Sequence, residues 1–292
     1  MDESNFQLKV LEDNVHLTKY VAKFIRLIYG PNIRTFSINY INTNQFNQTM
    51  LITNIIQSFQ DLITNVEVPV LSEYRKCDLV TPDGSRTIAN LILRYHQSII
   101  LIIKPILPLL YDSSLQHVID KNLETIESII SKGLYAACAT IEIISKLYST
   151  ERMFLLGFWD SQHLFCAILL LIISRVEGTH FRSLDKGIAL LKFMAHNRNI
   201  NAINCVGKLS KIKEILGFHG IELDLSETRL DFPLEKIKNP VIREMLPHLA
   251  DEFTDGLEPL SGSMKFTKIK DYDEQTKNNL ASLMHQIQQF DY

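Results

Sequence analysis

The amino-acid sequence predicts an all-α fold, a multi-helix bundle, from three observations. Apolar residues recur at the spacing that places side chains on one face of a helix. No segment shows the apolar–polar alternation of a half-buried strand. The 292 residues, 46% of them hydrophobic, are enough to bury a large core. We therefore expect one large helical domain, with room for a smaller segment beside it.

Two amphipathic helices open the chain. The first is predicted over 8–28 and is expected to stop at Gly30-Pro31, because glycine and proline end helices. Its apolar positions are Leu8, Leu11, Val15, Val21, Ile25 and Ile28. The second is predicted over 50–62 and is expected to end before 66–69, because a proline disfavours helix in the residue before it. The segment 71–85 is then predicted to be a loop.

Two long apolar helices are predicted in the middle of the chain. One spans 88–106, where Pro105 and Pro108 are expected to kink or end it. The other spans 123–147 and contains small residues that permit close packing against a neighbouring helix. These small residues are Gly133, Ala136, Ala137 and Ala139.

A third apolar helix is predicted over 164–175. Asp160 is expected to cap its N-terminus, and Trp159 is expected to pack onto Leu164 as a hydrophobic staple. The helix is apolar on nearly every side. We therefore expect it at the centre of the bundle.

Helices over 184–196 and 202–216 complete the helical region, and the composition changes at 217–220 toward prolines and acidic residues. We divide the chain into a helical domain, 1–217, and an acidic and helical C-terminal tail, 218–292. A last amphipathic helix in the tail carries Leu280, Leu283, Met284, Ile287 and Phe290.

Charge and cysteine spacing exclude several functions. The net charge of −3 and a pI near 6.3 leave no basic excess for phosphates, so this chain alone is not expected to bind DNA. Cys77, Cys138, Cys166 and Cys205 lack the close spacing of zinc sites, and the histidines lack metal-binding spacing. We expect no metal or cofactor in this chain, and we interpret the last three cysteines as reduced core residues.

Secretion and membrane insertion are not expected either. The N-terminus has no charged region followed by an apolar one, as a signal peptide would. The longest apolar runs, such as 98–111, contain Lys104 and two prolines and are expected to fall short of a membrane span. The sequence thus predicts a soluble protein with no membrane partner.

The run LILRYHQSIILIIKP, residues 91–105, resembles a signature of the regulatory (middle homology) region of fungal zinc-cluster (Zn2Cys6) transcription factors. Lys104 stands where that family usually has arginine. Three further blocks agree in order: 133–147, where Cys138 follows an alanine pair; 158–173; and 187–202. The last block carries Leu191, Met194, Ala195, Asn199 and Ala202. The resemblance covers about residues 85–216.

The resemblance implies a nuclear regulator of RNA polymerase II genes with a helical regulatory domain. Family members also carry a six-cysteine cluster that binds two zinc ions, a coiled-coil dimerisation element and often an acidic activating tail. The sequence here has neither of the first two, so zinc and DNA binding are expected only through an absent module. The sequence is compatible with a fragment of a longer factor, with a short gene model, and with a regulator that lost its DNA-binding module. The implied partners are coactivators or corepressors, a small-molecule inducer and a second copy of the chain.

Three residues on the family-like helix are candidate interaction or pocket residues: Arg94, His96 and Lys104. For His96 the leading alternative is a hydrogen-bonded core histidine. Arg94 and Lys104 could instead pair with a carboxylate or extend to the rim of the bundle. Asp160 and His163 could form an acid–base pair, but helix capping explains Asp160 better and no third catalytic group is identified. No catalytic residue is assigned, and we do not expect an enzyme.

The acidic-apolar segment 244–260 is a candidate activation segment, with Met245, Leu249, Phe253 and Leu257 as its apolar residues. A plain surface helix has the same composition. Three functions therefore stay open. They are a transcription-regulatory domain, a generic helical protein-interaction scaffold, and an all-α enzyme with an apolar pocket.

Overall fold

The computed structural model describes residues 3–29, 45–71, 74, 86–111, 115–149, 156–176, 182–218 and 273–289. Regular structure in these residues is entirely helical, which confirms the all-α class. The main helices are α1 (Glu3–Tyr29), α3 (Gln45–Leu62), α5 (Arg86–Ile103), α8 (Leu123–Ser149), α9 (Phe158–Val176), α10 (Arg182–His196), α11 (Ile200–Phe218) and α14 (Glu274–Gln289). Shorter ones are the π-helix η2 (Ile63–Leu71), α6 (Ile106–Leu109) and α7 (Gln116–Lys121).

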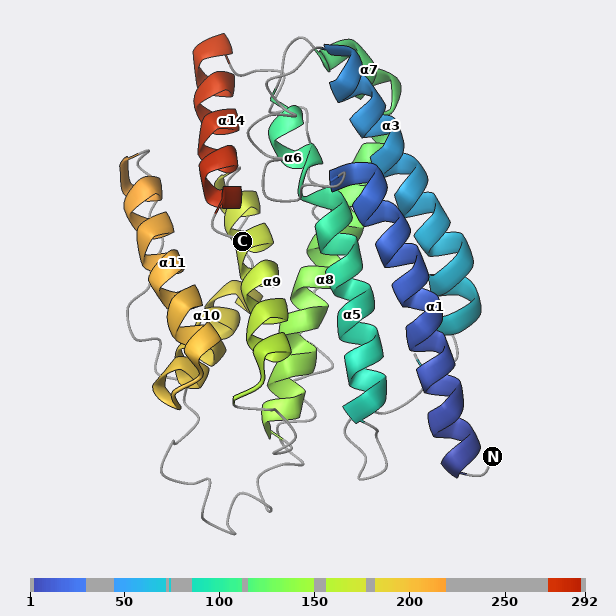
Figure 1. The fold of residues 1–292 in the computed structure, drawn as a ribbon. Coiled ribbons are helices and arrows are strands. Elements are labelled where there is room, and N and C mark those ends of the chain that lie inside the picture. The colour runs from blue at the N-terminus through green and yellow to red at the C-terminus, as the bar shows by residue number, and fades with distance from the viewer. Residues whose placement is uncertain are drawn as a thin grey trace.

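The helices form a bundle in which α8 and α9 lie between two outer groups (Figure 1). On one side α5 packs against α8, and α1 and α3 cover α5. On the other side α10 and α11 pack against α9 and against each other. The helix α14 packs against α6, α9 and α11.

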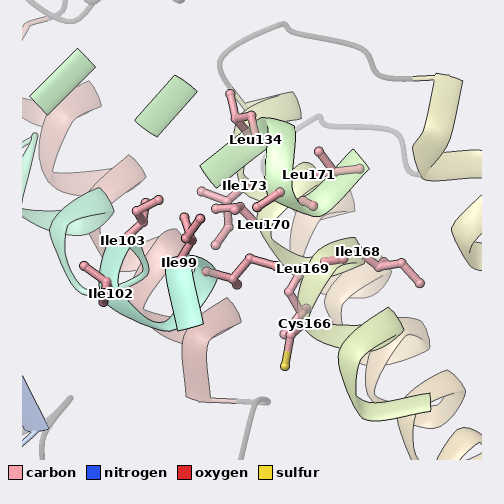
Figure 2. Packing of buried hydrophobic residues seen from close by; sticks show 14 of the residues in the cluster. Ile99, Ile102, Ile103, Leu134, Cys166, Ile168, Leu169, Leu170, Leu171 and Ile173 are labelled. Atoms are coloured by element: carbon pink, nitrogen blue, oxygen red, sulfur yellow. The ribbon is translucent and has the colours of Figure 1, made fainter. Parts of the chain in front are cut away.

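The helix α9 is the centre of the core, as its composition predicts. Every residue from 163 to 173 is buried, because α5, α8, α10, α11 and α14 surround this segment. Figure 2 shows Leu170 and Ile173 on the side of α9 that faces Ile99 and Ile103 of α5 and Leu134 of α8, whereas Ile168 points to the opposite side.

The helix α1 buries only the second half of the predicted apolar positions. Ile28 is buried, and Val21 and Ile25 pack against the core, whereas Leu8, Leu11 and Val15 are exposed. Other core residues of α1 are Val10, Leu17 and Phe24. Both sets have helical spacing, so α1 carries two apolar stripes on different faces. Packing against α3 and α5 decides which stripe is buried.

The second helix does not end before 66–69. It continues as η2 through Pro69 to Leu71, although proline lacks the N–H that a helical turn uses. Tertiary contacts hold this segment. Val66 is fully buried, and Glu67 accepts hydrogen bonds from Tyr95 at 2.5 Å and Lys132 at 2.9 Å. Apart from Leu71 and Tyr74, the predicted loop 71–85 lies outside the described residues, as does the predicted stop at Gly30-Pro31.

Two apolar helical stretches bear on the question of membrane insertion. Among the described residues, Arg86–Leu109 and Leu123–Ser149 are long and apolar enough to cross a membrane, so the expectation that such runs fall short was wrong. Both are mostly buried inside the bundle, and core helices of soluble proteins pass the same test. Pro105 does interrupt the first one, between α5 and α6.

The C-terminal helix α14 belongs to the bundle. Asp273 caps it, accepting a hydrogen bond from the Thr276 amide at 2.7 Å, and Leu283 is fully buried. Residues 219–272 lie outside the described part of the chain. The division of the chain at 217–220 therefore stays a prediction.

Candidate functional site

The three candidate residues Arg94, His96 and Lys104 face different neighbours. Arg94 is exposed and donates hydrogen bonds to Asn14 Oδ1 at 3.1 Å and Thr18 Oγ1 at 2.8 Å, both on α1. His96 and Lys104 are buried. Arg94 thus joins α5 to α1 instead of pairing with a carboxylate.

His96 lies between aromatic rings. Its ring centroid is 5.8 Å from that of Tyr95 and 6.4 Å from that of Tyr135 on α8. It is 8% exposed. This is a core position, as the alternative interpretation of the sequence proposed.

Lys104 does not reach the rim of the bundle. It lies at the break between α5 and α6 and is 6% exposed. The pKa of its amine is lowered to about 7, chiefly by burial; Cys166 opposes this shift, and the positive charge of Lys208 on α11 adds to it. An amine with this pKa is protonated in only part of the molecules at neutral pH and can accept a proton.

Lys104 belongs to a polar cluster that joins α5, α9 and α11. Cys166 of α9 accepts a hydrogen bond from Gln162 Nε2 at 3.6 Å and another from Gln97 of α5. Lys208 Nζ lies 5.5 Å from the centre of the Phe165 ring. Burial raises the pKa of the Cys166 thiol, so the thiol stays protonated at neutral pH.

The start of α9 holds a second polar group, and here the capping prediction was wrong. Asp160 is the third residue of the helix, 1% exposed, and forms an ion pair with Arg86 at the start of α5. Trp159 is 68% exposed and does not cover Leu164, so it makes no staple. The helix begins at Phe158, six residues before the predicted start at 164, so Asp160 lies inside its first turn.

His163 lies one turn after Asp160 and is also buried. Burial lowers the pKa of its imidazole to about 4; the Asp160 carboxylate opposes this shift, while Arg86 and Arg94 add to it. The ring is therefore neutral at physiological pH. The carboxylate of Asp160 has Arg86 as its ion-pair partner.

A helix cap occurs at Asn199, between α10 and α11. Asn199 Oδ1 accepts a hydrogen bond from the Ala202 amide at 2.9 Å, and Asn199 Nδ2 donates to the Gly157 carbonyl at 3.2 Å. Asn201 Nδ2 donates to Ser161 Oγ at 2.9 Å. These bonds hold the start of α11 against the start of α9.

Large exposed apolar residues gather at these two helix starts. We call them the apolar rim: Leu156, Phe158, Trp159, Ile200 and Ile203. Exposed aromatic and aliphatic side chains in one region are typical of interaction surfaces. The sequence analysis missed the apolar rim because it assigned Trp159 to the interior.

In the described part of the chain, no three His, Cys, Asp or Glu side chains lie close enough together to hold a metal ion. Cys166 and Cys205 are buried free thiols, and burial raises the pKa of Cys205 to about 12. Cys138 is free and half-buried. The candidate activation residues Met245, Leu249, Phe253 and Leu257 lie outside the described residues.

Comparison with known proteins gives no relative: no protein-family model, curated protein or solved structure matches the chain.

Proposed function

We propose that this chain is the regulatory domain of a fungal zinc-cluster transcription factor that acts in the nucleus, and that it is not an enzyme. The supporting observation is that the blocks resembling that family lie on helices that pack together. They fall on α5, α8, α9, and the α10–α11 pair. In the bundle α8 contacts both α5 and α9, and α10 contacts both α9 and α11.

The arrangement suggests how such a domain could transmit a signal. The polar cluster around Lys104 and Cys166 links three helices through a few contacts inside an otherwise apolar core. Polar groups in such a core contribute little stability unless they are fully satisfied. An inducer or coregulator that favours one packing of α5, α9 and α11 would shift the equilibrium between active and inactive arrangements.

A reporter assay in yeast tests this proposal. Residues 1–292 are fused to an unrelated DNA-binding domain, and reporter output is compared with the Leu170→Asp variant at equal protein abundance. Leu170 lies in the core, so an aspartate there disrupts the bundle. Leu27→Asp makes the same change at an exposed position and serves as the matched control. We expect Leu170→Asp to change the output and Leu27→Asp to leave it unchanged.

Deleting 244–260 in the same fusion should lower any activation, if this segment contacts a coactivator. We expect the fusion protein to bind DNA only through the fused DNA-binding domain, because residues 1–292 carry a net charge of −3 and have no basic excess for phosphates. Output equal to that of the bare DNA-binding domain in every fusion protein would count against a transcriptional role.

The second candidate function is a helical protein-interaction scaffold. The apolar rim favours it, since five large apolar side chains are exposed near two adjoining helix starts. An inactive reporter together with cytoplasmic localisation would favour this alternative.

A further inference from the structure

The helix α1 carries an apolar stripe that faces away from the bundle. Leu8, Leu11 and Val15 are 55, 58 and 50% exposed, and the exposed residues Thr18 and Ala22 continue the same line. The spacing of these five residues alternates between three and four, which is the repeat of helices that pair lengthwise. We call these residues the outer stripe.

The rest of the described bundle does not cover this face. The core residues of α1 are Val10, Leu17, Phe24 and Ile28, and α1 packs against α3, α5 and η2. Within the outer stripe, the exposed Thr18 accepts a hydrogen bond from Arg94 of α5 at 2.8 Å. In Figure 1 α1 lies along one edge of the molecule. A continuous apolar line on an edge helix is costly to leave in water, so it indicates a partner.

The charges beside the outer stripe indicate what that partner is. Glu12 and Lys19 are exposed, and each follows a stripe residue directly, so both border the stripe on the same side. Their charges are opposite and they lie two turns apart. A second α1 that runs antiparallel, related by a two-fold axis near Val15, places its Lys19 beside Glu12 and its Glu12 beside Lys19.

The same axis makes the apolar contacts self-complementary. Val15 meets Val15 of the other copy, and Leu8 lies near the other copy's Ala22. Such an interface uses one patch twice and closes after two copies. We propose that α1 is a self-association surface, through which two copies of this chain pair as antiparallel helices. This inference goes beyond the proposed function and does not rest on it.

The positive charge of Arg94 opposes this pairing. Arg94 of α5 borders the other side of the outer stripe, where it is held by Asn14 and Thr18. The two-fold axis brings the Arg94 side chains of both copies to the same side of the interface. Arg94→Gln should therefore strengthen the dimer.

Sedimentation equilibrium of the full chain tests the proposal. We expect reversible monomer–dimer association, with a dissociation constant on the order of micromolar for an interface of this small size. Leu11→Glu should raise that constant by about tenfold or more. Leu27→Glu is the matched control, because Leu27 is an exposed leucine of the same helix outside the outer stripe. A monomeric wild-type chain, or equal effects of the two substitutions, would overturn the proposal.

Charge reversal tests the antiparallel arrangement. Glu12→Lys and Lys19→Glu should each weaken the dimer, and the double variant should restore it, because the opposite charges again face each other. Parallel helices would place like residues opposite each other, so the single variants would then have no specific effect. Circular dichroism confirms that each variant stays folded. Failure of the double variant to recover association, or a weaker dimer in Arg94→Gln, would refute the two-fold arrangement.

Discussion

The close approach of α5 to α8 can be tested at Gly133 of α8. A Cβ atom built at this glycine would lie 2.3 Å from Ile103 Cδ1 and 3.5 Å from Leu170 Cδ2. Ile103 is fully buried, and it lies beside Leu134 and Leu170 (Figure 2). A methyl group at position 133 therefore forces the Ile103 side chain into already filled space.

Two effects of Gly133→Ala oppose each other. Alanine favours helix over glycine by about 1 kcal/mol, because it restricts the unfolded chain more. Overpacking of a filled core costs about 1–3 kcal/mol. The clashing Cδ1 atom is the end of a side chain that can turn, but Ile103 is fully buried, so we expect the second effect to exceed the first, with a net loss of about 1 kcal/mol.

Gly207 of α11 provides the matched control. No atom lies within 4 Å of a Cβ built there. Gly207→Ala should therefore raise the free energy of unfolding by about 0.5–1 kcal/mol. Urea denaturation of both variants measures the difference, which we expect to be about 1–3 kcal/mol.

Ile103→Val tests the cause, because it removes the Cδ1 methyl group. Alone it should cost about 1 kcal/mol. Combined with Gly133→Ala it should cost less than the sum of the two single changes, by about 1 kcal/mol. Strict additivity, or a stabilising Gly133→Ala equal to Gly207→Ala, would show that α5 and α8 are not packed this closely.

Three further predictions concern buried charges. Asp160→Ala should lower the free energy of unfolding by about 3 kcal/mol, because it removes the carboxylate that pairs with the Arg86 guanidinium. A loss near 1 kcal/mol would be that of a lost helix cap and would contradict this prediction. The folded pKa of His163 is about 4 and the unfolded pKa is about 6.5, so the unfolded chain binds an extra proton between these values. The free energy of unfolding should therefore fall as the pH falls from 6.5 to 4, and it should fall less steeply in His163→Gln. Parallel pH profiles of the wild type and this variant would refute the prediction. Lys104→Met should raise stability at pH 7 on the order of 1 kcal/mol, and the gain should shrink toward pH 10.5, where the unfolded lysine also loses its proton. A pH-independent effect of Lys104→Met, measured by urea denaturation, would contradict the lowered pKa.

The sequence by itself determined the local structure. Helical spacing identified the main helices, Pro105 located the break after α5, and the uniformly apolar α9 indicated the centre of the bundle. The small residues of α8 indicated a close approach, which Gly133 confirms. These features follow from interactions between residues close in the chain, or from composition alone.

Only the tertiary structure decided where polar groups and alternative faces lie. The residue type and position of Asp160 predict a helix cap, but Asp160 lies inside α9, buried, and pairs with Arg86, 74 residues away in the chain. Pro69 predicts a helix end, but the buried Val66 and the contacts of Glu67 keep the helix intact. The helix α1 has two apolar stripes of similar spacing, and only packing against α3 and α5 selects the buried one. Periodicity defines the faces of a helix, whereas long-range contacts decide which face is buried and which charge finds a partner.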